Sequence, residues 1–60
     1  MLIRAYGMDM HVNPNYIVSM WKTVGSETYY FMNLYGESDR ISIDKESYDL
    51  IVEWMERHDV

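Results

Sequence analysis

Apolar residues alternate with polar ones in the short segments of the chain, are dense throughout residues 16–35, and recur at helical spacing near its end. Alternating or β-branched segments predict strands, and clusters of Gly, Pro and Asn between them predict turns. The predicted strands cover residues 2–6, 8–12, 16–24, 27–35 and 40–43. The pattern therefore predicts a small antiparallel β-sheet of four to five strands that is complete before the helical segment begins.

The two long strands are predicted to form a hairpin whose register depends on the loop between them. Gly25-Ser26 fits a two-residue type II′ turn, in which glycine takes the first central position. With that loop, Met20 lies opposite Phe31 on one face, and Trp21 lies opposite Tyr30 on the other. Both faces then carry large apolar side chains, whereas a sheet with one solvated face alternates apolar with polar residues.

One amphipathic helix is predicted over residues 45–58. Asp44 is a favourable N-cap, and Glu46 in the first turn suits the helix dipole. The apolar arc is roughly 200° wide, about twice the usual stripe. It holds Ser47, Tyr48, Leu50, Ile51, Val52, Trp54, Met55 and His58. We expect a single domain, residues 1–60, of the α+β class, with the small antiparallel sheet followed by this one C-terminal helix.

The excess of apolar surface predicts self-association. A domain of this size buries only about 60% of its unfolded surface and often needs disulfides, metals or oligomerisation. The chain has no Cys, and its two His are far apart in sequence. We expect the helix to cover the hairpin face of Ile17 and Leu34, which leaves the opposite face as an interface in a dimer or tetramer. The expected interface residues are Tyr16, Val18, Met20, Tyr29, Phe31, Tyr35 and Trp54.

The net charge of −5 arises entirely within residues 37–60. An acidic half repels phosphate, so the charge disfavours nucleic acid as a partner and favours another protein. No apolar run approaches the roughly 20 residues that span a bilayer, and no signal-peptide core is visible. Together with the lack of Cys, these features favour a cytoplasmic setting.

No residue pattern typical of catalysis or metal binding is visible. The helix carboxylates fall on the polar arc, where general acid or base chemistry lacks a cleft. His11 has no nucleophile or carboxylate fixed beside it, and no G-x-S-x-G elbow or calcium-loop ligand series occurs. We therefore expect no enzyme and no cofactor. The aromatic residues of the hairpin have an alternative use as a base-stacking platform.

Several short motifs follow one another in a recognisable order. In chain order they are Asn13-Pro14, Ile17, Gly36, Ile41, Ile43 and Glu46-Ser47 at the start of the helix. In this order, over residues 1–56, the chain resembles the small flagellar accessory proteins of the FlbD type. The resemblance implies a motility accessory role without known catalysis, and it assigns no site residues. The strand and helix layout is also similar to the coactivator-type single-strand DNA-binding fold, although a fold does not determine function.

These observations favour a small non-catalytic protein-interaction or regulatory module that acts as a homo-oligomer. The setting that we expect is a motility system or a phage or other mobile element, because very short acidic chains are frequent among phage-encoded inhibitors. The alternative is a nucleic-acid-associated protein or an anti-CRISPR-type inhibitor that uses the aromatic sheet face.

Overall fold

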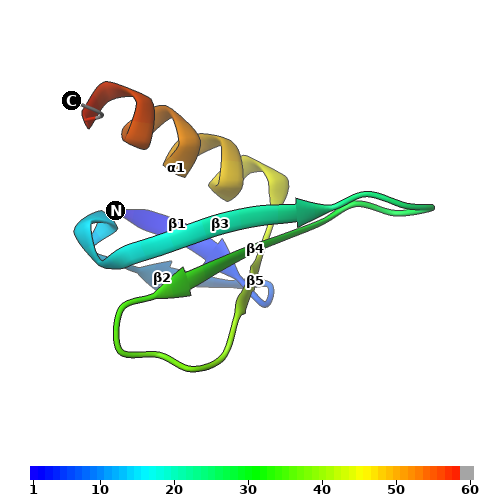
Figure 1. The fold of residues 1–60 in the computed structure, drawn as a ribbon, viewed down its shortest axis with the longest axis horizontal. Helices are drawn as coiled ribbons and strands as arrows, with labels where there is room; N and C mark the ends of the chain where they lie inside the picture. Colours follow the sequence, from blue (N-terminus) through cyan, green and yellow to red (C-terminus); the bar gives the residue numbers. More distant parts are fainter. Residues whose placement is uncertain (59–60) are drawn as a thin grey trace.

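A computed structural model describes residues 1–58 and contains a five-stranded antiparallel sheet with one helix packed on one face (Figure 1). The elements are β1 (Leu2–Ala5), β2 (Met8–His11), the 3₁₀ helix η1 (Pro14–Tyr16), β3 (Ile17–Thr23), β4 (Tyr29–Leu34), β5 (Ile41–Ile43) and α1 (Lys45–His58). The α+β layout and the range of the helix confirm the sequence prediction. Within these residues, no helix is long and apolar enough to cross a membrane.

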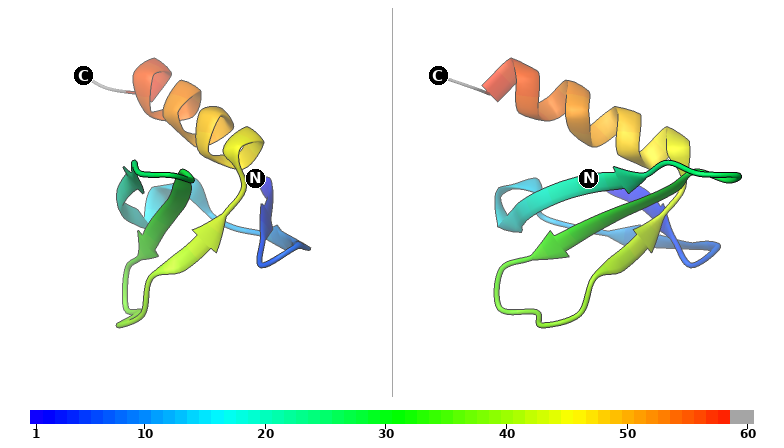
Figure 2. Two further views of the ribbon diagram at one scale, coloured as in Figure 1. Left: turned by 90° about the vertical axis from the view of Figure 1, so that its right-hand side faces the viewer. Right: turned by 45° about the vertical axis from the view of Figure 1, so that its right-hand side comes forward.

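The strand order of the sheet is β2-β1-β5-β4-β3, so the short strand β5 joins the two hairpins. β5 pairs with β1 at one position, where Ala5 lies opposite Ile43, and with β4 at three. This order leaves β2 and β3 as the two edges of the sheet. Figure 2 shows α1 on one face and the β3–β4 hairpin extending beyond the rest of the sheet.

Tyr6 and Gly7 form the tight turn between β1 and β2. Their φ angles of 53° and 76° lie in the left-handed region, which a type I′ hairpin turn requires at both central positions. Glycine adopts this conformation freely, whereas tyrosine does so at a steric cost. The Tyr6 hydroxyl donates a hydrogen bond to the carbonyl oxygen of Arg40 at 3.0 Å. The turn is thereby held to the segment that enters β5.

The predicted loop of the β3–β4 hairpin is wrong. β3 ends at Thr23 and β4 begins at Tyr29, so the connection spans residues 24–28 and not Gly25-Ser26 alone. A type II′ turn requires a positive φ at its first central residue, and Gly25 does not have one. The longer loop shifts the pairing of the two strands by one residue.

The shift changes the partners across the hairpin. Trp21 lies opposite Phe31, and Met20 lies opposite Met32, so the predicted pairing of Met20 with Phe31 is wrong. A β-bulge after Ile17 restores its predicted partner at the end of β4. One extra residue reverses the face of every side chain beyond it. Val18 is the extra residue of the bulge, so the facing of the β3 side chains changes there.

The bulge exchanges the two faces of β3 relative to the prediction. Leu34 and Met32 of β4 pack on the core as expected, and Ile17 joins them. Met20 also packs against the core, whereas Trp21 lies on the outer face and stacks on Phe31 with ring centroids 5.7 Å apart. The helix therefore covers the face of β4 that the sequence predicts as core. Along most of β3 it covers the face that the sequence predicts as interface.

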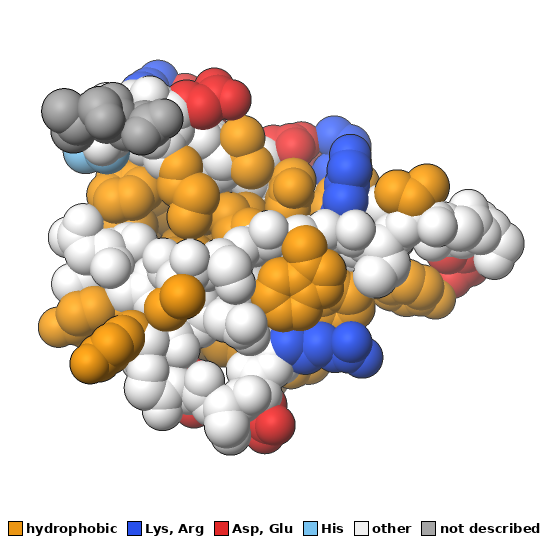
Figure 3. All heavy atoms as spheres, in the orientation of Figure 1, with side chains coloured by type: hydrophobic (Ala, Val, Ile, Leu, Met, Phe, Trp, Pro, Cys, Tyr) orange, Lys and Arg blue, Asp and Glu red, His pale blue; other side chains and the backbone are white. Residues whose placement is uncertain are grey.

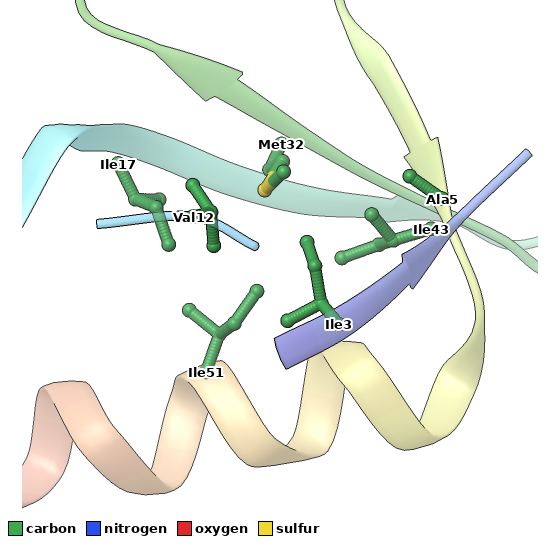
Figure 4. Close-up of a cluster of buried hydrophobic side chains, with 7 residues drawn as sticks. All are labelled: Ile3, Ala5, Val12, Ile17, Met32, Ile43 and Ile51. Atoms are coloured by element: carbon green, nitrogen blue, oxygen red, sulfur yellow. The ribbon is translucent and has the colours of Figure 1, made fainter. Parts of the chain in front are cut away.

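The core fills the space between α1 and the sheet. Its buried members are Ile3, Ala5, Val12, Ile17, Met32, Ile43 and Ile51. Figure 4 shows Ile51 reaching from the helix toward the side chains of the sheet. Ile51 and Met32 are fully buried, and each such side chain contributes about 1.5–3 kcal/mol by leaving water. Tyr48 adds a second contact, with its ring 5.0 Å from that of Tyr30 on β4.

Asp44 caps the helix as predicted. Its Oδ1 accepts the backbone N–H of Ser47 at 2.8 Å. Hydrogen bonds from the side chain and backbone of Ser47 lower the pKa of the Asp44 carboxyl below its ordinary value. Ser47 is buried, and its Oγ accepts the backbone N–H of Arg4 at 2.7 Å, while the Asp44 N–H donates to the Arg4 carbonyl at 3.3 Å. The start of the helix thus provides hydrogen-bond partners for both the N–H and the C=O of Arg4. β5 ends at Ile43 and does not reach these groups.

Candidate functional site

A groove, here called the α1–β3 groove, lies between the helix and the edge strand β3. It has a volume of about 830 Å³. Its lining residues are Pro14, Asn15, Ile17, Val18, Ser19, Met20, Tyr48, Val52, Trp54, Met55, Glu56 and His58. Figure 3 shows apolar side chains gathered between the helix at the top and the long strand below it. The groove is therefore a surface feature with a mixed apolar and polar lining.

The path of the helix creates the groove. α1 begins close to the sheet and diverges from it toward its C-terminal end (Figure 1). η1 supplies two further lining residues, Pro14 and Asn15. Asn13 orders this segment because its Oδ1 accepts the Asn15 N–H at 3.0 Å, and Pro14 fixes its own φ. The local sequence thus fixes one part of the groove while the helix leaves the rest open.

Methionine and aromatic side chains supply much of the apolar lining. Met20 comes from β3 and Met55 from α1, and both are half-buried. The ring of Trp54 stacks on His58 with centroids 4.3 Å apart, and His58 Nδ1 lies 2.8 Å from the Trp54 carbonyl oxygen. Methionine adapts its shape to a partner, and tryptophan is a frequent anchor of interfaces. The groove therefore suits contact with another polypeptide.

The strand beside the groove has an unpaired edge. β3 is the longest strand, with seven residues, and no other strand of residues 1–58 pairs with its outer side. Such an edge presents free backbone N–H and C=O groups to another chain. The opposite edge strand, β2, has four residues and carries Asp9 and His11. Short length discourages pairing, so β3 is the better edge for strand addition.

Three of the seven expected interface residues line the groove. They are Val18, Met20 and Trp54. Tyr16 lies in η1, immediately before β3, and its carbonyl accepts the Tyr35 N–H at 2.7 Å. Tyr16 and Tyr35 are therefore neighbours at one end of β3. Both are exposed, as is Val18.

The remaining two expected residues lie elsewhere. Tyr29 is exposed at the hairpin loop, where its hydroxyl donates to Glu27 at 2.5 Å, and this bond raises the pKa of Tyr29. Phe31 is buried on the outer face between Trp21 and Arg40, whose guanidinium carbon lies 4.5 Å from the Phe31 ring centroid. Phe31 is therefore already covered by its own chain.

Nine of the twelve lining residues are absent from the expected interface, among them Val52, Met55 and Glu56. Val52 and Met55 are expected to lie against the protein's own sheet, yet the structure leaves them half-buried in the lining. The wide apolar arc of the helix is the signal for them, because one sheet face cannot cover so broad an arc. Glu56 lines the groove and Lys22 lies on the adjoining strand, and both are exposed. Nothing in the sequence pattern singles these two out.

Four other charged side chains of the helix form two local pairs. Lys45 bonds Asp49 at 2.7 Å, which raises the pKa of Lys45, and Arg57 pairs with Glu53. These exposed pairs follow the i,i+4 spacing, and solvent screening keeps their contribution to stability small. Within residues 1–58, no group of three or more His, Cys, Asp or Glu could hold a metal ion.

Comparison of the chain with protein-family models, curated proteins and solved structures finds no significant match. The α1–β3 groove and the unpaired edge of β3 are thus the features that bear on function. Their chemistry combines apolar contact with free backbone hydrogen-bonding groups.

Proposed function

We propose that this protein is a small non-catalytic interaction module that acts as a homo-oligomer. The observation that carries the proposal is the α1–β3 groove beside the unpaired edge of β3. In strand-addition binding, a sheet edge supplies main-chain hydrogen bonds and neighbouring pockets take alternate side chains. β3 and the groove offer both parts, and the ligand that uses both is another polypeptide.

Exposed apolar side chains near β3 support the proposal. Tyr16, Val18, Val24 and Tyr35 are 58, 63, 78 and 80% exposed. Single exposed apolar residues are ordinary, but adjoining ones mark an interaction surface. Tyr16, Val18 and Tyr35 adjoin at one end of the strand, beside the groove. Contact with a second polypeptide would remove this surface from water.

The biological role that fits such a module is regulatory or accessory. The order of motifs over residues 1–56 supports a motility accessory protein of the FlbD-like kind. The small size and the net charge of −5 support a protein of a phage or other mobile element. In either setting the protein acts by contact, with a second copy and with a further protein.

Light scattering coupled to size-exclusion chromatography tests the oligomer. At micromolar concentration, the particle mass should be at least twice the 7.2 kDa of the chain. Dilution should lower the mass toward that of one chain, because association depends on concentration. A folded protein that keeps the mass of one chain at every concentration would contradict the proposal.

One observation favours nucleic-acid association as a second candidate function, including an anti-CRISPR-type inhibitor. Trp21, Phe31 and Arg40 form a stack on the outer face, away from the acidic helix. Aromatic rings with a cation are the elements of a single-strand binding platform. A gel shift with a labelled single strand, at about 50 and 200 mM salt, separates the candidates. Salt-sensitive binding that Trp21→Ala abolishes would favour this second function.

A further inference from the structure

We propose that the α1–β3 groove is occupied by β3 of a second copy, paired antiparallel about a two-fold axis at Met20. This inference rests on the proposed function, because it names the surface through which the homo-oligomer forms. Met20 is the central residue of β3, Ile17–Thr23. An axis at Met20 pairs the strand with itself about its middle. Ser19 then lies opposite the partner's Trp21, and Val18, at the bulge, lies opposite the partner's Lys22.

The paired edges make one continuous sheet. β3 extends over about 23 Å at the usual rise of a strand, and it is the last strand of its sheet. Antiparallel pairing at this edge places the two-fold axis perpendicular to the joined sheet. Both copies of α1 then lie on the same face, and the two grooves adjoin at the seam. The partner's strand thereby enters the space that the diverging helix leaves beside β3.

Side-chain alternation places methionine in the groove. Met20 lies on the helix side of β3, so the even-numbered residues of an antiparallel partner also face the helices. The partner's Met20 therefore lies directly opposite Met20 and beside the half-buried Met55 and Val52. Flexible thioethers fill irregular apolar spaces well, so this contact closes the groove without rearrangement of the helix.

The charge of Lys22 favours a two-fold axis at Met20. Lys22 is the one charged residue of β3 and forms no ion pair within residues 1–58. With the axis at Met20, the partner's Lys22 lies opposite Val18, which lines the groove together with Glu56. The ammonium group of the partner's Lys22 therefore enters a groove that also holds the Glu56 carboxylate. With the axis one residue later, the partner's Lys22 would lie opposite Met20, which packs against the core, and desolvating a cation there is costly.

The ends of the strand and the size of the contact agree with this register. The axis at Met20 brings the end of the partner's strand, followed by Val24, toward the end of β3 that Tyr16 precedes, and both side chains are largely exposed in the single chain. A stable interface of standard size takes about 800 Å² from each partner. That is about one sixth of the 4585 Å² surface of this chain. The proposed dimer must bury an area of this order to be stable.

Single cysteines test the register directly, because the natural chain contains none. Val18→Cys and Lys22→Cys change exposed side chains, so both variants should fold. When the two proteins are mixed in equal amounts and mildly oxidised, the mixed disulfide dimer should predominate. Opposite residues lie about 5 Å apart, within disulfide reach, whereas Val18 and the partner's Val18 are separated by roughly 13 Å.

Two further cysteine variants bracket the axis. Met20→Cys should form a disulfide with itself across the axis, because residue 20 lies opposite its own copy. Thr23→Cys is the matched control on the same strand. It should not form a disulfide dimer quickly, since the two copies of residue 23 lie about 20 Å apart in this register. Rapid self-linking at residue 18, 22 or 23 instead would place the axis elsewhere and overturn the proposal.

Charge reversal tests the predicted ion pair without cysteine. Lys22→Glu and Glu56→Lys should each raise the dimer Kd about fivefold or more, the change that corresponds to a pair worth about 1 kcal/mol. The double variant should return the Kd toward that of the natural protein. Asp9→Lys, on the opposite edge strand β2, controls for the change in net charge. A double variant no tighter than the weaker single variant contradicts the pairing of Lys22 with the partner's Glu56.

The outcomes separate this inference from the proposed function. A natural protein that remains a monomer overturns both. A natural dimer whose cysteines link at other positions overturns the β3 register and leaves the homo-oligomer intact. Mixed disulfides between residues 18 and 22, together with recovery in the double charge variant, support the register.

Discussion

Ser47→Ala should destabilise the protein, because Ser47 joins the start of the helix to the middle of the sheet. Its Oγ is the acceptor for the Arg4 backbone N–H at 2.7 Å, and the side chain is 5% exposed. Leaving a buried donor without its acceptor costs about 1–3 kcal/mol. The higher helix propensity of alanine offsets a few tenths of that amount. The free energy of unfolding should therefore fall by about 1.5 kcal/mol.

Urea denaturation followed by circular dichroism measures this loss. With a denaturant dependence of about 1 kcal/mol per M for so small a domain, the midpoint should fall by roughly 1.5 M. Protein concentration must be equal for all samples, since association with a second copy adds to apparent stability. Ser26→Ala, in the exposed loop 24–28, is the matched control and should change the unfolding free energy by less than about 0.5 kcal/mol.

An unchanged midpoint in Ser47→Ala would refute the reasoning. It would mean that the Arg4 N–H finds another acceptor when the Ser47 Oγ is removed. The hydrogen bond between Arg4 and Ser47 would then not stabilise the packing of α1 against β1. A double-mutant cycle with Asp44→Ala adds a second criterion. Because the Ser47 side chain also hydrogen-bonds the Asp44 carboxyl, the effects of the two substitutions should fall short of additivity.

Three other substitutions test separate parts of the fold. Asp44→Ala should lower the unfolding free energy by about 0.5–2 kcal/mol through loss of the N-cap, whereas Asp44→Asn keeps a cap. Folding lowers the pKa of Asp44 below its ordinary value of 3.8, so its charge stabilises the fold above that pH. This contribution is lost as pH falls through the lower folded pKa, and the stability gap between the natural protein and Asp44→Asn should close below about pH 4. Phe31→Ala should cost about 3 kcal/mol in thermal or urea unfolding, since Phe31 is buried within its own chain. Gly7→Ala should cost about 1 kcal/mol in the same assay, because its φ of +76° disfavours a Cβ; an unchanged midpoint in either variant would contradict its explanation.

Local sequence signals account for most of the elements. Alternation and β-branched or aromatic content together predict all five strands, and the Asp44 cap with the apolar arc predicts α1 with its observed bounds, Lys45–His58. These features depend on residues that are close in sequence. The long-range role of Ser47 is different, because its partner Arg4 is 43 residues away. The place of Ser47 on the apolar arc indicates that it is buried. It cannot reveal which backbone N–H donates a hydrogen bond to the Ser47 hydroxyl.

The hairpin register shows where sequence reasoning fails. Gly25-Ser26 fits a two-residue turn, yet residues 24–28 form a longer loop and a bulge near Val18 compensates for the shift. Bulges leave little trace in a sequence, and one such residue exchanges the faces of a strand. The error placed Met20 with Phe31 on one surface. Met20 instead meets Trp54 at the α1–β3 groove, which forms only because the helix diverges from the sheet.

Sedimentation equilibrium of the natural protein beside Val18→Lys tests the central claim most directly. Val18 is exposed, so the variant should fold, but the new cation would lie directly opposite the partner's Lys22. Met8→Lys, an exposed apolar position on the other edge strand, is the matched control. At micromolar concentration, the natural protein and Met8→Lys should have twice the 7.2 kDa chain mass, and Val18→Lys should have the mass of one chain. Three monomers, or three equally stable dimers, would contradict self-association through β3.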